Sequence, residues 1–451
     1  MRHLRILLST AALAGALPAS AAELDFEGFY RARARAFNSL SLNRSAELAE
    51  GTQAWVQHRV WLRPRVLIDE HAAVFIDFRA LDGVYWGDTP VSPTNVTGAP
   101  VFDALEDGLA GPTTADGGVT PQTLTLWRAW GEAHLGNTHF KVGRMPVHWG
   151  AGIWQNDGLG LDADFGDTVD RAQVEVRFAD AVYTSVAVDL HTEGYVNATD
   201  DLTVFSGIVG YLTETVDAGL YMQYRTSPAR NLGIFSADLA ASARIGNLSV
   251  DLEGIAFFGK GDIGGDLDDV RIASGGGVID VGLKPKPLRL GVEGGFGSGD
   301  RDLSDQAVHT FTFDRDFDVA LMMFEQPMPR LQAVIPSETN GGLSYDEVLT
   351  GNAMSNVLYL RPTVGYELRD DLAADVMLIM ARTAALPDSA GDRAGYGIEV
   401  DGRVTWEPTE HIQAAGTMGV FVPGKFYRNA ESDLDFNQAS FGFELNTRIR
   451  F

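Results

Sequence analysis

The sequence predicts an all-β fold, namely a transmembrane antiparallel β-barrel of about 18 strands. Three observations support this prediction: residues alternate between apolar and polar in strand-length segments, connections are alternately short and long, and the final strand has two different faces. In residues 441–451, one face carries Phe441, Phe443, Leu445, Ile449 and Phe451, and the other carries Glu444, Asn446, Arg448 and Arg450. One face therefore suits lipid and the other suits water.

The alternation recurs along the chain in segments of strand length. We predict strands at residues 25–37, 53–67, 71–81, 123–135, 138–144, 169–179, 181–191, 201–213, 215–226, 233–246, 247–260, 270–283, 287–298, 354–368, 371–384, 395–407, 409–422 and 437–451. The count is even, as a single-chain bacterial barrel requires. Because no linker interrupts the series, we expect one domain over residues 23–451.

The connections are short after every even-numbered strand. The clearest tight turns lie at residues 136–137, 180–181, 246–247, 284–287, 369–371 and 408–410. Longer loops follow most odd-numbered strands, at residues 82–122, 145–168, 299–353, 385–394 and 423–436. A soluble β-sandwich would also alternate apolar and polar residues, but nothing in its physics makes every second connection long. Transmembrane barrels show this asymmetry, so we predict short periplasmic turns and long extracellular loops.

The N-terminal segment has the features of a secretory signal. Residues 1–5 include the basic Arg2 and Arg5, residues 6–17 form a short apolar run, and residues 19–22 are small. We predict a signal peptide at residues 1–22 and a location in the outer membrane of a Gram-negative bacterium, in contact with its lipid. A strand that ends on Phe451 looks like the C-terminal signal of such barrels. No later apolar run approaches the roughly 18 residues that a membrane helix needs.

Charge and composition narrow the range of partners. The chain has 35 basic and 61 acidic residues, and removal of Arg2 and Arg5 would leave 33 against 61, a net charge of −28. This balance disfavours nucleic-acid binding. There is no cysteine, so disulfides and thiolate metal sites are excluded. We expect no cofactor, and we assign no catalytic and no metal-binding residues.

Rows of arginine indicate a basic wall inside the barrel. Arg31, Arg33 and Arg35 alternate with alanines, so three guanidinium groups stand on one face of the first strand. On the lipid side near the midplane each would cost about 2–4 kcal/mol, so they must face the lumen. The same alternation gives the predicted pathway residues Arg31, Arg33, Arg35, Arg59, Arg63, Arg65, Arg79, Arg128, Lys141, Arg448 and Arg450.

The opposing wall is predicted to be acidic. Its inward residues are Asp251, Glu253, Glu293, Glu367, Glu399 and Asp401. A barrel of this strand number is expected to leave an aqueous channel, in which two charges about 10 Å apart interact by only about 0.4 kcal/mol. Selection must therefore come from many charges acting together. The basic rows favour an anion pathway over simple pairing between neighbouring strands.

Several long loops are rich in acids. Residues 82–122 and 145–168 contain acidic residues without one Lys or Arg, and Asp262, Asp266, Asp268 and Asp269 lie in a glycine-rich loop. Clustered carboxylates can bind Ca²⁺, but none of these has an EF-hand spacing. Solvated loop acids are the simpler interpretation. Long loops on a rigid scaffold are also candidate gates.

Three motifs carry a resemblance to a known family. They are Lys141-Val142-Gly143-Arg144, then Gly297-Ser298-Gly299-Asp300-Arg301-Asp302 followed by Phe311 and Phe313, and finally Phe421-Val422-Pro423-Gly424-Lys425-Phe426. In order and spacing they resemble the alginate export family of outer-membrane porins. The resemblance implies a single-chain pore that exports an anionic polysaccharide and is gated by loops and by periplasmic export proteins. It also implies that Arg144 is a lumen or constriction residue.

Two other functions stay open. A general or solute-selective diffusion porin for small solutes would place its basic and acidic walls on opposite sides of an eyelet. A barrel enzyme would need a nucleophile and a base within hydrogen-bond reach, for which Ser185, His134 and Asp189 have suitable parity. Nothing in the sequence fixes the geometry of these three residues, so we predict that the protein is not an enzyme.

Overall fold

The structure is a computed structural model, and it describes only part of the chain. The described residues are 23–40, 42, 51–87, 124–178, 180–191, 202–228, 231–262, 269–302, 305–326, 339–340, 343–344, 353–386, 394–427 and 437–451. The predicted signal peptide, most of the predicted loop at 82–122, and the candidate Ca²⁺ ligands Asp266 and Asp268 lie outside the described residues. No helix formed by the described residues is long and apolar enough to cross a membrane.

Eighteen long strands form the wall in the described part of the chain. They are β1 (Glu23–Asn38), β2 (Thr52–Leu67), β3 (Ala72–Gly87), β4 (Thr125–Leu135), β5 (Thr138–Pro146), β6 (Thr168–Arg177), β7 (Val182–His191), β8 (Leu202–Leu212), β9 (Val216–Ser227), β10 (Leu232–Ile245), β11 (Leu248–Gly261), β12 (Val270–Leu283), β13 (Leu288–Gly297), β17 (Val357–Arg369), β18 (Leu372–Thr383), β19 (Gly395–Thr409), β20 (Ile412–Pro423) and β21 (Ser440–Arg450). The connections contain β14 (Ala307–Val308), β15 (Thr339–Asn340), β16 (Leu343–Ser344) and the 3₁₀ helix η4 (Lys425–Tyr427).

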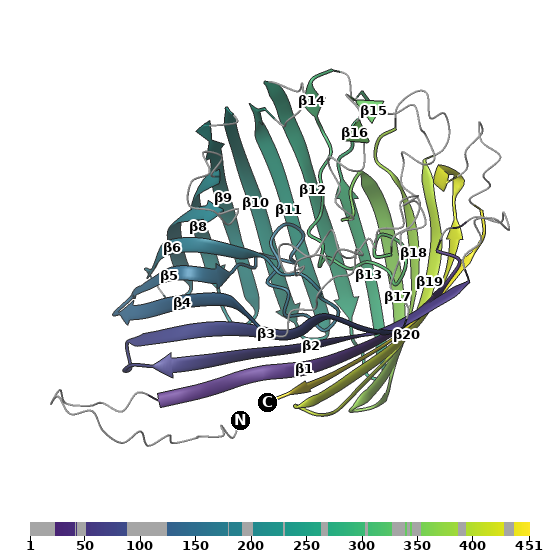
Figure 1. Ribbon diagram of the computed structural model, residues 1–451, viewed down its shortest axis with the longest axis horizontal. Coiled ribbons are helices and arrows are strands. Elements are labelled where there is room, and N and C mark those ends of the chain that lie inside the picture. The colour runs from purple at the N-terminus through teal and green to yellow at the C-terminus, as the bar shows by residue number, and fades with distance from the viewer. Residues whose placement is uncertain are drawn as a thin grey trace, which may run out of the picture.

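These strands close into a single antiparallel barrel, which confirms the predicted fold class (Figure 1). Each long strand pairs with the next along the chain, and β1 also pairs with β21. At this seam the N–H groups of Gly28 and Phe451 each donate to the other residue's carbonyl at 3.0 Å. A Cβ at position 28 would lie 2.6 Å from the Trp61 carbonyl oxygen and 2.8 Å from the Phe451 ring, so the close approach requires glycine.

The two faces of the wall differ as predicted. In β21, Phe441, Phe443 and Leu445 are 54 %, 43 % and 41 % exposed, whereas Glu444 and Asn446, which point to the other face, are buried. The exposed apolar side chains continue around the barrel, for example in Val142, Val186, Val209, Phe258, Val364 and Met418. An outward apolar band with polar residues inside is the arrangement that a bilayer demands of a barrel.

The two rims also differ as predicted. The short-turn rim carries connections such as those at 136–137, 246–247 and 410–411, and the other rim carries the long loops. β3 is longer than predicted, because it runs to Gly87 instead of ending at residue 81. Its pairing with β2 shifts register opposite His58, and Leu81 has a φ of 61°. A bulge adds residues at this point, so a segment that looks like a turn lies inside the strand.

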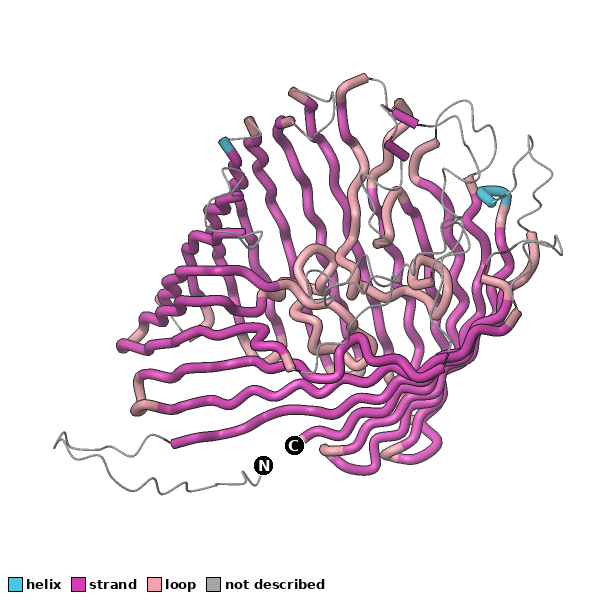
Figure 2. The backbone as a smooth tube through the Cα atoms, viewed as in Figure 1, coloured by secondary structure: helices cyan, strands magenta, loops and turns pink. Residues whose placement is uncertain are grey.

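Two long connections fold into the barrel. We refer to residues 147–167, between β5 and β6, as L3, and to residues 298–302 and 305–326, which follow β13, as the L7 segment. Figure 2 shows loop backbone within the ring of strands at mid-height. The lumen is therefore narrowed at this level of the barrel, where side chains of L3 and the L7 segment pack against the wall.

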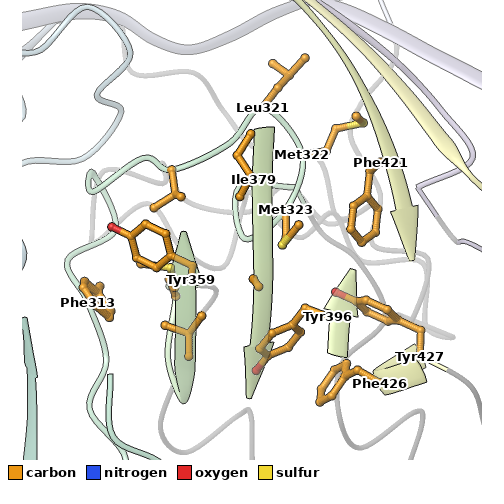
Figure 3. Packing of buried hydrophobic residues seen from close by; sticks show 14 of the residues in the cluster. Phe313, Leu321, Met322, Met323, Tyr359, Ile379, Tyr396, Phe421, Phe426 and Tyr427 are labelled. Atoms are coloured by element: carbon orange, nitrogen blue, oxygen red, sulfur yellow. The ribbon is translucent and has the colours of Figure 1, made fainter. Parts of the chain in front are cut away.

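The interior contains a hydrophobic core. Phe313, Leu321, Met322 and Met323 of the L7 segment are buried against wall residues including Tyr359, Ile379, Tyr396 and Phe421 (Figure 3). Phe311 and Phe313 have ring centroids 4.9 Å apart in an edge-to-face arrangement. Burial of large apolar side chains at about 25 cal/mol per Å² stabilises the inward position of the L7 segment.

Candidate pore constriction

The basic wall is formed where β1 meets its two neighbours. Arg31 is the direct cross-strand partner of Arg59 on β2 and of Arg448 on β21. Like charges placed directly opposite each other on a sheet are destabilising unless other groups compensate them. Arg31, Arg33 and Arg59 are nevertheless only 3 %, 0 % and 5 % exposed. The compensation comes from L3.

Backbone carbonyls of L3 accept hydrogen bonds from these arginines. Arg31 donates to the carbonyl oxygens of Leu161, at 3.3 Å, and Ala163. Arg33 donates to Leu161 O at 3.1 Å, and Arg59 donates to Ala163 O at 3.3 Å. Neutral carbonyl oxygens satisfy guanidinium donors without cancelling their charge, so the wall keeps its positive character.

Two carboxylates lie among the arginines of β1. Glu444 of β21 is 2.7 Å from Arg35 and 3.9 Å from Arg33. The other carboxylate is that of Asp164. It is 2.8 Å from Arg31, 2.6 Å from Arg33 and 3.4 Å from Arg35. Burial alone would raise the pKa of Asp164, but the guanidinium groups of Arg33, Arg35, Arg31 and Arg59 hold that pKa well below its usual range. Asp164 is therefore ionised at every pH at which the barrel would function.

The basic wall continues onto β3, β4 and the lower part of β21. Arg79 donates to Phe165 O at 2.5 Å, Arg128 donates to Asp167 O at 2.8 Å, and Arg448 donates to Leu159 O at 2.9 Å. Trp127 lies beside Arg79 and Arg128, with ring-to-guanidinium distances of 3.0 and 3.3 Å. The predicted arginines of five strands, β1–β4 and β21, are thus brought together around L3.

The predicted acidic wall binds backbone N–H groups of the loops, whereas the basic wall binds their backbone carbonyls. Glu253 accepts from Ala151 N of L3 at 2.6 Å. Glu399 accepts from Met322 N and Met323 N of the L7 segment, both at 2.7 Å, and Asp401 accepts from Leu321 N at 2.9 Å. The remaining predicted acids pair with wall residues: Glu293 with Tyr359 and Arg361, Asp251 with Arg244, and Glu367 with Lys286.

The other predicted pathway residues face the lumen nearer the short-turn rim. Arg63 binds Asp77 at 2.5 and 2.8 Å and lies between the rings of Trp61 and Trp130, at 4.7 and 4.9 Å. Arg65 pairs with Asp25 at 2.8 Å and its side chain is 40 % exposed. Lys141 lies 3.8 Å from Glu132, and Arg450 donates to Gln413 at 2.9 Å.

Arg144 is a correction to the sequence-based assignment. Its cross-strand partners are Ala129 and Asp170, and Asp170 in turn faces Leu190, which is 49 % exposed on the outer surface. Arg144 therefore lies on the outer face of β5, where it binds Asp170 at 2.8 and 2.7 Å. Strict alternation places Lys141 and Arg144 on opposite faces, because they are three residues apart.

L3 and the L7 segment hold each other in place. Asp316 accepts from the backbone N of Asp164 at 2.6 Å and of Phe165 at 2.9 Å, and Asp314 N donates to Ile153 O at 2.8 Å. Asp314 also shares a side-chain hydrogen bond with Asp167. Burial raises the pKa of Asp167 to about 6, and burial together with the neighbouring Asp167 and Asp316 raises the pKa of Asp314 to about 9.

The motif residues around Ser298 direct the L7 segment inward. Ser298 Oγ accepts from Gly275 N at 2.9 Å and donates to His309 O at 2.5 Å, and Asp300 accepts from His309 N at 3.0 Å. Asp162, one of the acids considered as a Ca²⁺ ligand, instead pairs with Arg403 at 2.8 Å. Asp162 and Asp164 are thus engaged by arginines, and L3 is bound to the wall by charge complementarity.

Two residues of the enzyme alternative, Asp189 and His134, have other partners. Asp189 binds Arg171 at 2.6 and 2.8 Å, and His134 stacks on His139 with centroids 3.7 Å apart. Sequence reasoning missed the group formed by Glu132, His134 and His139, whose donor atoms lie close enough together to hold a metal ion. The signal was present, because His134 and His139 are placed symmetrically about the turn at Gly136.

No protein-family model matches the sequence, and no curated protein matches it either. Several solved structures do. Acinetobacter baumannii OccAB1 has a TM-score of 0.56 at 8 % identity, covering 95 % of this chain and 96 % of that chain. Pseudomonas aeruginosa OccK9 (OpdG) has a TM-score of 0.54 at 12 % identity, covering 95 % and 98 %. A BenF-like porin from Pseudomonas fluorescens has a TM-score of 0.53 at 10 % identity, covering 95 % and 98 %.

The chain shares the fold of these solved structures, one of which is a porin. At identities of 8–12 % the likeness extends to the fold, over nearly the whole length of both chains. The alginate export family, to which the motifs pointed, is not among these structures. The porin fold is consistent with the apolar outer band and with the two inward-folded connections described above.

The substitution Asp164→Asn should loosen L3. It keeps the shape of the side chain but removes the nearest carboxylate from Arg31 and Arg33, and removal of one partner from such a pair costs on the order of 3 kcal/mol. We expect a larger and noisier single-channel conductance in planar bilayers. Asp157→Asn, in the same loop, is the matched control, because the Asp157 side chain accepts only from Leu159 N among the hydrogen bonds described. Equal conductance in the two variants would contradict the role of Asp164.

The contact between L3 and the L7 segment should weaken as pH rises. The pKa values of Asp167 and Asp314 are raised while L3 and the L7 segment are in contact. The two carboxyl groups therefore contribute fully to the stability of this contact below their ordinary pKa, and the contribution is lost as pH rises through about 6 and then about 9. The ion pairs of Asp164 stay constant over this range, since its pKa is lowered.

Conductance measured from about pH 5 to pH 9 should therefore increase, and Asp314→Asn should make this increase smaller. The exposed loop residue Asp269 provides a control substitution, Asp269→Asn, that should leave the profile unchanged. A profile that is flat in the unmodified protein would contradict this account of the loop contact.

Proposed function

We propose that this protein is an outer-membrane diffusion channel selective for small anionic solutes. The observation that supports this most strongly is the segregation of charge inside the barrel. Arginines of five strands, β1–β4 and β21, lie on one side of the constriction, and many of their acceptors are neutral carbonyls. The carboxylates of Asp164, Glu444 and Asp77 pair with some of these arginines, but the arginines outnumber them. The wall beside L3 is therefore a region of positive potential, which concentrates anions.

The barrel provides the other requirements of such a channel. Its outer surface carries an apolar band. L3 and the L7 segment enter the lumen from the long-loop rim and narrow the path there. Partly exposed charges line the route toward the short-turn rim, among them Arg65 and Lys141. Pseudomonas aeruginosa OpdK has a similar fold, with a TM-score of 0.51 at 10 % identity, and its structure was solved with vanillate. This similarity supports a small carboxylate as the class of solute.

Export of an anionic polysaccharide, to which the sequence motifs pointed, fits the structure less well. Residues of the second and third motifs, including Phe311, Phe313 and Phe421, lie in the hydrophobic core that fixes the L7 segment inside the barrel. A polymer would need this core to separate from the wall along with L3. A small solute needs only the space that the loops leave.

The anion preference is tested by Arg65→Gln. A unit charge about 5 Å from a passing ion contributes about 0.8 kcal/mol in water-like surroundings, so its removal should lower the anion-over-cation permeability ratio by at most about fourfold, and by less in high salt. The measurement is the reversal potential across a bilayer in a KCl gradient.

Arg144→Gln is the matched control for Arg65→Gln. Both arginines pair with an aspartate, but Arg144 faces outward, so its removal should leave the permeability ratio unchanged. If Arg144→Gln changed the ratio and Arg65→Gln did not, the placement of the pathway would be wrong. A channel that prefers cations in its unmodified form would contradict the proposed function itself.

The size of the permeant separates the two candidate functions. Proteoliposomes containing the full chain should admit a benzoate-sized monocarboxylate and exclude a uronate oligomer of about ten sugars, because the constriction is occupied by L3 and the L7 segment. Asp164→Asn should accelerate entry of the small anion. Passage of the oligomer at a rate comparable to that of the monocarboxylate would instead support polysaccharide export.

A further inference from the structure

Three potential metal ligands lie together on the inner wall near the short-turn rim. Glu132 and His134 belong to β4 and His139 belongs to β5, and His134 and His139 are direct cross-strand partners next to the turn at residues 136–137. They share the inward face with Lys141, whereas Phe140 and Val142 on the other face are 40 % and 63 % exposed. The three side chains therefore face the lumen.

Their spacing is close to that of a bound metal ion. One donor atom from each residue lies within 4.8 Å of the other two, and His139 Nε2 is 3.0 Å from Glu132 Oε2. The imidazole rings of His134 and His139 are nearly parallel, at 21°, with centroids 3.7 Å apart. Tetrahedral ligands about 2.0–2.1 Å from Zn²⁺ lie roughly 3.3 Å from one another. To bind one ion, the two stacked rings must turn so that a nitrogen lone pair of each points at the same position.

The surroundings orient the carboxylate for this role. Trp130 Nε1 donates to Glu132 Oε1 at 2.8 Å, and Lys141 Nζ lies 3.8 Å from the same oxygen. Oε2 is consequently the oxygen directed at His139. Outer partners that fix the orientation of a ligand strengthen metal binding. The adjacent turn is also held, because Asn137 Nδ2 donates to Arg177 O at 3.0 Å.

The donor set selects the class of metal. Two imidazoles and one carboxylate suit Zn²⁺ and its transition-metal neighbours, whereas Ca²⁺ and Mg²⁺ require mainly oxygen ligands. We propose that Glu132, His134 and His139 form a Zn²⁺ site on the inner wall at the short-turn rim of the barrel. Three protein ligands leave the fourth position to water or to a carboxylate from the lumen.

The test uses the full chain folded in detergent and purified without a polyhistidine tag. Calorimetric titration with Zn²⁺ should show one stoichiometric site, and His134→Ala or His139→Ala should each raise its dissociation constant at least tenfold. Glu132→Gln should weaken it as well. His411→Ala is the matched control, because His411 lies on the same rim with Glu410 3.5 Å away, and it should leave binding unchanged.

A second measurement identifies the ligands directly. Electron paramagnetic resonance of one equivalent of Cu²⁺ should report two imidazole nitrogens in the unmodified protein and one in either single histidine variant. The absence of stoichiometric Zn²⁺ binding, retention of full affinity in the double variant His134→Ala/His139→Ala, or equal loss in His411→Ala would each overturn the proposal. Circular dichroism of every variant checks that the barrel is folded.

Discussion

Hydrogen bonding between inward arginines and the carbonyls of L3 is the interaction on which the interior of this barrel depends. Arg31, Arg59 and Arg448 are direct neighbours on three strands, so their mutual repulsion must be compensated. L3 is an irregular segment whose buried carbonyls must find donors. The guanidinium groups provide donors for the carbonyls of L3, and these carbonyls provide acceptors for the guanidinium groups. Asp164 adds one negative charge at the point where Arg31 and Arg33 converge. Neither the arginine rows nor the path of L3 can be explained without the other.

The opposite wall uses the same principle with the signs reversed. Carboxylates such as Glu253 and Glu399 accept from backbone N–H groups, while arginines donate to backbone carbonyls across the lumen. A peptide segment that lies between the arginine wall and the carboxylate wall is oriented by the dipoles of its peptide groups. Charge segregation therefore fixes which way the inward connections face, and the aromatic and methionine core around Met322 fixes their depth.

The sequence was sufficient to predict the strands of the barrel wall, but it was insufficient to predict how the long connections fold inside the barrel. Alternation specified the barrel, the strand count and the inward orientation of residues such as Arg33 and Glu399, because each strand must present one face to lipid. It failed at β3, where a bulge near Leu81 hides the continuation of the strand. Arg144 was misplaced because a motif was preferred to parity. The positions of Asp164 and Phe311 depend on long-range contacts of irregular chain, for which periodicity gives no signal.

The seam between Gly28 and Phe451 has a consequence for how the molecule assembles. It joins residues at the two ends of the described chain, so the ladder between β1 and β21 can form only after every intervening strand has been synthesised. Until then β1 presents a row of unpaired amides and carbonyls on one side, which is a template for pairing with other chains. Because such a long-range contact is slow to form, insertion of this barrel requires that the edge of β1 be shielded until β21 arrives.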